Sequence, residues 1–157
     1  MYPRLFNLCR RFFKDEHDII SSINNGMLKV FKQIKSYDPS RGELFNWIYT
    51  IVRNEALSYL KSKRNHSKLI IDEDQCVITS ENPFDKFEWS ETFQLLDKLP
   101  PMTRAVCNLF YFEDFEIKEI AKTLNIKDGT VKWHLNESRN KLRSIINKTV
   151  NIARYGS

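Results

Sequence analysis

The chain has 157 residues, of which 41% are hydrophobic, and it carries 25 Lys and Arg against 20 Asp and Glu. This size suits one ordinary domain or two small ones, and the composition excludes wholesale disorder and a collagen-like structure. No apolar run approaches the roughly 20 residues that span a bilayer, and the N-terminus does not resemble a signal peptide, so a soluble intracellular protein without membrane contact is expected.

Three helices are predicted in the first part of the chain from apolar residues that recur at helical spacing. The first covers roughly residues 3–14, and the second covers about Ile19–Lys35. Pro and Gly interrupt the pattern at residues 37–42, which indicates a surface turn. The third helix is expected at about Glu43–Lys63.

Helical spacing is lost from Arg64 to about Asp85, where Asn, Ser, Asp and Pro are frequent, and it returns further on. Four more helices are expected, at about Phe87–Leu99, Met102–Phe112, Ile117–Leu124 and Gly129–Asn147. Helices this short bury little apolar surface alone, so each group of helices must pack as a small bundle.

The predicted fold is therefore all-α, with two small helical domains at residues 1–64 and 87–150 joined by an acidic flexible linker at residues 65–86. Residues 72–97 carry a net charge of −7, whereas the sequence before them carries +7 and the sequence after them +5. Basic blocks commonly mark polyanionic partners, because Lys and Arg release condensed counterions from a phosphate backbone. A solvated lysine-rich surface explains the charge equally well.

Residues 116–143 have the pattern of a helix-turn-helix motif. The first helix carries an apolar stripe at i, i+3, i+4 and i+7, in which Ala121 is small enough to let a second helix cross closely. The turn is expected at residues 125–128, where the Asp128 carboxylate can cap the next helix and suits its dipole.

The second helix of this motif has two different faces. Val131, Leu135, Ser138 and Leu142 fall within a narrow arc that suits the core. The opposite arc is polar and basic and includes an exposed Trp133, a combination that fits a DNA major groove, although a plain three-helix bundle remains the alternative. The candidate DNA-contacting residues are Lys127, Thr130, Lys132, Trp133, His134, Asn136, Glu137, Arg139, Asn140 and Lys141.

The motif EIA-x₂-L-x-I-x₂-GTVK-x₂-L, followed by S-R-x-K-L-R, resembles the promoter −35 reader of bacterial extracytoplasmic-function (ECF) sigma factors. Residues 45–60, FNWIYTIVRNEALSYL, resemble the segment of the same family that melts and reads the −10 element. The two motifs in this order are strongly specific. The resemblance covers nearly the whole chain, although the linker resembles the family only in its acidic composition.

The resemblance implies that the first domain holds the melted promoter strand. Aromatic and polar side chains give a flipped base a surface to stack on, and basic side chains hold the backbone. Ordinary core packing is an equal alternative for Phe45 and Trp47. The candidates for the −10 element are Tyr37, Ser40, Arg41, Phe45, Asn46, Trp47, Tyr49, Arg53 and Asn54.

The resemblance also implies that the helix at about Ile20–Lys35 docks on core RNA polymerase. The chain departs from the family here, because the usual acidic pair is missing and Asn24 stands where Gln is expected. Glu137 also replaces a common Arg of the recognition helix. We therefore hypothesise a divergent sigma factor that reads a non-standard promoter or is brought to DNA by a partner, and whose docking on core polymerase relies on hydrophobic contacts. The candidate core-binding residues are Asn24, Met27, Leu28, Phe31 and Lys32.

The expected function is that of a sigma factor in the bacterial cytoplasm, at the nucleoid. Its expected partners are core RNA polymerase and promoter DNA, with an anti-sigma factor or a DNA-bound recruiting protein as a further partner. A free-standing helix-turn-helix regulator that does not bind core polymerase is the main alternative. A defective sigma factor that only titrates the polymerase is another.

An enzyme is not expected, and neither is a metal or a cofactor. The three histidines are scattered, and the four glycines form no phosphate-binding loop. The three cysteines lie far apart and contain no C-x-x-C pair, so a zinc site and a disulfide framework are both improbable.

Overall fold

The computed structural model describes residues 1–64 and 82–155, apart from the side chain of Arg64. Every regular element in these two stretches is helical, which confirms the predicted all-α fold. The chain divides into two compact units, Met1–Ile70 and Ile71–Ser157. Most of the predicted linker at residues 65–86 lies outside the described residues.

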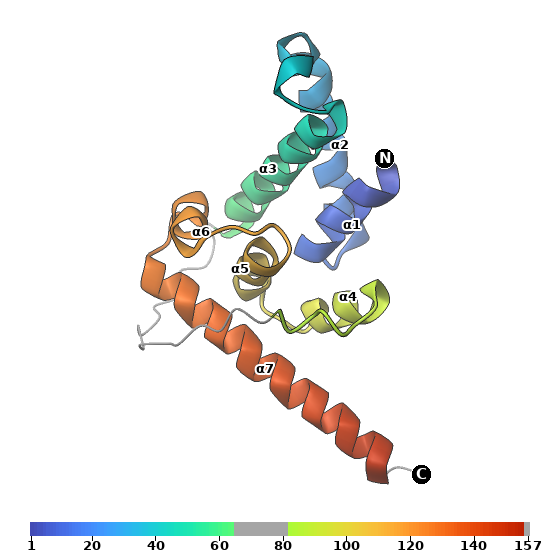
Figure 1. The fold of residues 1–157 in the computed structure, drawn as a ribbon, viewed down its shortest axis with the longest axis vertical. Coiled ribbons are helices and arrows are strands. Elements are labelled where there is room, and N and C mark those ends of the chain that lie inside the picture. The colour runs from blue at the N-terminus through green and yellow to red at the C-terminus, as the bar shows by residue number, and fades with distance from the viewer. Residues whose placement is uncertain (65–81, 156–157) are drawn as a thin grey trace. The chain divides into compact units, whose positions relative to one another are not determined.

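The first unit contains three α-helices and two short 3₁₀ turns (Figure 1). Their bounds are α1 Tyr2–Phe12, α2 Glu16–Gln33, η1 Ile34–Ser36, η2 Pro39–Arg41 and α3 Leu44–Arg64. Helix α2 begins three residues before the predicted start. The cause is a polar cap rather than an apolar pattern, since the Asp15 carboxylate accepts a hydrogen bond of 2.8 Å from the His17 backbone N–H.

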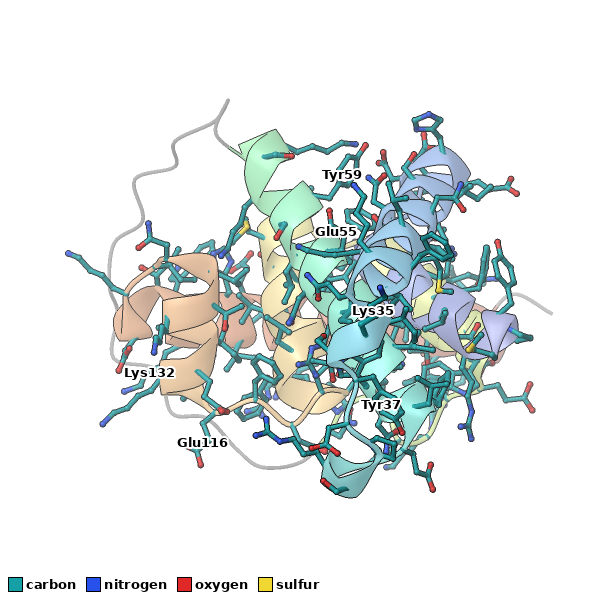
Figure 2. The ribbon with its side chains drawn as sticks, turned by 90° about the horizontal axis from the view of Figure 1, so that it is seen from above. Lys35, Tyr37, Glu55, Tyr59, Glu116 and Lys132 are labelled. Carbon is teal, nitrogen blue, oxygen red and sulfur yellow. The ribbon has the colours of Figure 1, made fainter. Side chains whose placement is uncertain are left out.

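Helices α2 and α3 cross closely at Gly26. A Cβ atom at that position would lie 2.9 Å from the Val52 Cα atom, which is closer than real Cβ contacts allow. Glu55 and Tyr59 point from α3 toward α2 (Figure 2), where Glu55 pairs with Lys29 at 3.2 Å and the Tyr59 hydroxyl donates to Asp18 at 2.8 Å. The crossing therefore sets which faces of both helices remain exposed.

The second unit contains α4 Trp89–Asp97, α5 Pro101–Tyr111, α6 Ile117–Leu124 and α7 Asp128–Tyr155. Helices α4 and α6 each start with a capping box, which satisfies backbone N–H groups at the helix N-terminus. The buried Arg104 of α5 forms a 2.9 Å ion pair with Asp97 and ties α5 to α4.

Helix α7 extends eight residues beyond the predicted C-terminal end at Asn147, to Tyr155, and begins one residue earlier than predicted, at Asp128. Its buried residues lie between Val131 and Leu142, and it contacts α5 and α6. Asp128 is the first residue of α7 and not the residue before it, and its carboxylate still lies in the first turn, where a negative charge suits the helix dipole.

Candidate nucleic-acid interfaces

The helix-turn-helix of the second unit is formed by α6, a short turn and α7. Asn125 ends α6 with a left-handed conformation, φ 55°, which amide side chains tolerate better than most residues. The Ile126 backbone N–H then donates to the Ala121 carbonyl at 3.0 Å, so the chain turns sharply into α7. Val131, Leu135, Ser138 and Leu142 are all buried, as their spacing predicts.

The exposed side of α7 presents polar side chains near its N-terminus. Lys127, Lys132 and Asn140 are exposed, and Lys132 lies on the outer surface of its helix (Figure 2). Glu137 is half-buried and lies 4.0 Å from the Lys141 Nζ atom, so part of its charge is compensated locally. Thr130, Asn136 and Lys141 are half-buried around these residues.

Two residues of the predicted polar arc do not lie on the surface as expected. His134 is only 5% exposed, and its Nδ1 atom lies 2.9 Å from the Thr103 hydroxyl oxygen. Trp133 is half-buried and contacts the His134 ring edge-on at 5.1 Å. The expected exposure was wrong because, at about 100° per residue, His134 lies at the edge of the core stripe, where α5 packs.

Arg139 is held by the body of the unit. It is half-buried, and its guanidinium donates to the Tyr111 hydroxyl at 3.2 Å. Burial raises the pKa of Tyr111 above its ordinary value, and the nearby Arg139 opposes this rise, so the phenol remains protonated at neutral pH. This contact fixes the middle of α7 against the end of α5.

A pocket of about 300 Å³ lies between the loop after α2 and the start of α3 in the first unit. The rings of Tyr37 and Trp47 meet at its side, with centroids 5.5 Å apart and planes inclined by 48°. Figure 2 shows Tyr37 in this loop beyond the end of α2. The pocket is lined by Ser36, Tyr37, Asp38, Arg41, Gly42, Glu43, Asn46, Trp47 and Thr50.

The loop that forms this pocket is held by its own polar groups. The Asp38 carboxylate accepts hydrogen bonds from the Ser40 backbone N–H at 2.9 Å and from the Ser40 hydroxyl at 2.7 Å. These bonds hold the pKa of Asp38 below its ordinary value. The Tyr37 hydroxyl donates to the Gly42 carbonyl at 2.9 Å, and Gly42 adopts φ 145°, which L-residues rarely adopt.

The structure separates the −10 candidates into two groups. Tyr37, Arg41, Asn46 and Trp47 line the pocket, and Ser40 stabilises its loop. Phe45 and Tyr49 instead form a ring pair at 6.1 Å that faces α1. Arg53 is half-buried and Asn54 is exposed further along α3.

Two arginines of α1 contact the second aromatic group. The Arg4 guanidinium lies 5.4 Å from the centroid of the Phe45 ring, and Arg11 donates to the Tyr49 hydroxyl at 3.0 Å. Sequence reasoning did not assign these arginines, nor five residues that line the pocket, which are Ser36, Asp38, Gly42, Glu43 and Thr50. The five pocket residues could have been found from the sequence, because each lies within four residues of an assigned position. No sequence signal pointed to Arg4 and Arg11, because only the packing of α1 on α3 brings them close to Phe45 and Tyr49.

The predicted polymerase-docking face lies along α2. Asn24, Leu28, Phe31 and Lys32 are exposed, and Met27 is half-buried. Phe31 is 79% exposed, which is unusual for so large an apolar side chain. This strip is separate from the buried face of α2 that packs on α3.

The described residues contain two free cysteines, Cys9 and Cys107, and both are buried. Burial raises the pKa of Cys9 and of Cys107 to about 12, so neither thiol is a nucleophile at neutral pH. Residues 1–64 and 82–155 hold no cluster of three or more His, Cys, Asp or Glu that could bind a metal ion. Within the same ranges, no helix has both the length and the apolar character needed to span a membrane.

Two sequence families match the chain in the order of its two units. Residues 1–66 match Sigma-70 region 2, and residues 91–142 match Sigma-70, region 4. The first match covers α1 to α3 with the aromatic pocket, and the second covers the helix-turn-helix.

Curated relatives align along most of the chain. The ECF RNA polymerase sigma factor SigE of Mycolicibacterium smegmatis is 26% identical over 92% of this chain, which spans 58% of the length of SigE. SigW of Bacillus subtilis is 25% identical, with 89% of this chain and 81% of SigW covered. SigM of the same organism is 24% identical, with 96% of both chains covered.

Two solved structures share the fold. One is the sigma factor RpoE in complex with the anti-sigma factor NepR from Bartonella quintana, which superposes with a TM-score of 0.53 at 18% identity and covers 92% of this chain and 91% of that one. The other is CnrH in complex with the cytosolic domain of CnrY, with a TM-score of 0.51 at 18% identity and coverage of 92% and 80%.

Proposed function

The chain belongs to the ECF family of RNA polymerase sigma factors, and from this membership we propose that it directs transcription initiation by binding core RNA polymerase and promoter DNA. The proposal assigns the −10 element and polymerase docking to residues 1–64 and the −35 element to residues 87–150. Residues 65–86 serve as the linker. The protein acts in the bacterial cytoplasm, at the nucleoid, and has no catalytic activity of its own.

The observation that carries the proposal is the pocket between Tyr37 and Trp47. A base in single-stranded DNA has two apolar faces and a polar edge. The inclined rings of Tyr37 and Trp47 offer an apolar wall, and Arg41, Asn46 and Glu43 supply donors and acceptors around it. This combination suits a base that has been flipped out of the duplex.

The second unit supports contact with the −35 element through the exposed part of α7. Lys127 and Lys132 suit phosphate contacts, and Asn136 and Asn140 suit base edges in the major groove. His134 and Arg139 support this surface from within, because they anchor α7 to Thr103 and Tyr111. Glu137 disfavours a phosphate and suits contact with a cytosine amino group.

The exposed strip on α2 supports docking on core polymerase. Leu28 and Phe31 are 54% and 79% exposed, and both lie on the face that α3 leaves uncovered. Contiguous exposed apolar residues mark interaction sites. The two solved neighbours contain a bound anti-sigma factor or the cytosolic domain of CnrY, so we propose that this chain also has a protein partner that regulates it.

The first test is co-elution of the purified chain with core RNA polymerase from its own source in size-exclusion chromatography. A sigma factor co-elutes and then initiates transcription from a promoter template. A free-standing regulator elutes separately yet binds duplex DNA, and that result would refute the proposal.

The pocket is tested with Trp47→Ala and the conservative control Trp47→Phe. Because base–aromatic stacking contributes about 1–3 kcal/mol, Trp47→Ala should weaken binding of the holoenzyme to single-stranded promoter DNA about 5- to 150-fold. Trp47→Phe keeps a ring in place and should retain most of the affinity. Equal binding by all three folded proteins would show that Trp47 does not contact the strand.

A further inference from the structure

The apolar stripe of α7 continues beyond the helices that cover it. Val131, Leu135 and Leu142 are buried where α7 contacts α5 and α6. In Figure 1 the red C-terminal end of α7 extends past both of these helices. At about 100° per residue the face of Leu142 continues into what we name the tail stripe. Its residues are Ile145, Ile146, Thr149, Val150, Ile152 and Ala153.

The tail stripe exposes apolar side chains of the kind that are usually buried. Val150 is 45% exposed and Ile152 is 71% exposed, although both are apolar. Five of the six residues of the stripe are β-branched, and such residues are weak helix formers that are not chosen to stabilise an isolated helix. Contiguous exposed apolar side chains of this kind mark a surface that another molecule covers.

Charge around the tail stripe limits what can cover it. From residue 138 to residue 155 the chain contains Lys and Arg but neither Asp nor Glu. Two tail stripes packed on each other would therefore bring like charges together. A flat lipid surface also fits poorly, because α5 and α6 stand on the same side of α7 as the stripe and each is about 10 Å across. The surface that covers the tail stripe must therefore be narrow enough to pass α5 and α6, and acidic enough to pair with the surrounding Lys and Arg.

The same chain carries such a surface on α4. Trp89 is 48% exposed and contacts the half-buried rings of Phe93 and Phe112, at 5.7 and 5.8 Å. Helix α4 has nine residues. The tail stripe, from Ile145 to Ala153, has the same length. We name this surface, with the exposed acids beside it, the α4 patch. Its exposed charged residues are Asp85, Lys86, Glu88 and Glu91, three acids against one lysine, so the patch is net negative.

We propose that the tail stripe of one copy docks on the α4 patch of a second copy. The two surfaces match in length, in apolar content and in opposite charge. They do not cover each other within a single chain, since Trp89 and Ile152 both remain exposed there. Each copy has one stripe and one patch, so a two-fold pair satisfies both junctions at once and closes as a dimer.

The test is sedimentation equilibrium of the full chain over a range of concentrations, at about 0.1 M and about 1 M salt. The wild type should dimerise at low salt and dissociate at high salt. Ile152→Glu places a charge in the stripe and should raise the dimer dissociation constant by at least about tenfold. Asn151→Glu adds the same charge on the opposite, exposed face of α7 and is the matched control.

The patch is tested with Trp89→Arg and, in case that variant unfolds, with Gln94→Arg, an exposed position on the same helix. Each variant should be largely monomeric alone. A mixture of Ile152→Glu with a patch variant should form a heterodimer, because one junction stays intact in such a pair. Association of two variants that are each monomeric alone would show that the stripe binds the patch. A contact between two stripes cannot produce this result.

Three outcomes overturn the proposal. The wild type can remain monomeric at every concentration at low salt. Ile152→Glu and Asn151→Glu can weaken association equally, which would make the effect one of charge alone. Association can also survive both patch variants. Vesicles of phosphatidylglycerol and phosphatidylcholine serve as a separate probe, and stripe-dependent binding to them by a monomeric chain assigns the stripe to a lipid surface instead.

Discussion

Gly26→Ala tests whether the crossing of α2 and α3 sets the structure of the first unit. The new Cβ atom would lie 2.9 Å from both the Cα and a side-chain methyl of Val52. The side-chain methyl could rotate away, whereas the Cα atom moves only if the two helices separate. Overpacking of this kind costs about 1–3 kcal/mol, and the better helix propensity of Ala offsets about 1 kcal/mol. Because the Val52 Cα atom cannot rotate away, the upper part of this range, about 2–3 kcal/mol, applies, and the net loss is about 1–2 kcal/mol.

The measurement is urea unfolding of the full chain combined with hydrogen exchange, which reports α2 and α3 separately from the second unit. Asn25→Ala is the matched control, because it changes an exposed neighbour on the same helix. Protection should fall in α2 and α3 for Gly26→Ala and stay unchanged in α5 to α7. A Gly26→Ala protein as stable as the Asn25→Ala control would refute the tight crossing.

Three further predictions concern the core, the loop and pH. Leu142→Ala should lower the free energy of unfolding by about 2–5 kcal/mol, whereas Ile152→Ala should change it by less than about 0.5 kcal/mol, because only Leu142 is buried. Equal losses in urea melts would contradict this. Gly42→Ala should strain the loop by about 1–3 kcal/mol, since φ is 145°, and an unchanged urea midpoint would exclude that strain. Burial is the largest single effect on Asp18 and opposes its ionisation, but the hydrogen bonds from Lys63 and Tyr59, with the nearby positive charges, together outweigh it and lower the Asp18 pKa.

The sign of the pH effect follows from the lowered pKa of Asp18. A carboxyl group with a lower pKa in the folded state stabilises the protein above its unfolded-state value of 3.8, and this contribution is lost as pH falls through the folded-state pKa. Asp18→Asn should therefore flatten the dependence of the urea midpoint on pH in the acidic range. Parallel curves for the wild type and Asp18→Asn would show that the contact with Lys63 does not contribute.

The helix-turn-helix illustrates what could be predicted from spacing alone. Val131, Leu135 and Leu142 were assigned to the core because their side chains recur on one face, and a buried stripe needs no further information. His134 shows the limit of this reasoning. It lies at the edge of the stripe, where only the position of α5 decides whether a polar side chain is exposed or buried.

In the candidate site of the first unit, some features could likewise be predicted from the sequence and others depend on tertiary packing. The loop from Tyr37 to Gly42 and the start of α3 are neighbours in sequence, so their common role could be predicted before their geometry was known. The contacts of Arg4 with Phe45 and of Arg11 with Tyr49 could not be predicted, because they join residues 41 and 38 positions apart. Such pairs form only when α1 packs against α3.

The sequence by itself determined the all-α fold, the order of the two units and the family, because apolar periodicity and short motifs are local properties of the chain. Only the tertiary structure decided which side of α3 each aromatic ring faces, that His134 is buried, and that the apolar stripe of α7 extends beyond its covering helices. These features depend on where one helix ends relative to another, and contacts between distant residues set that position.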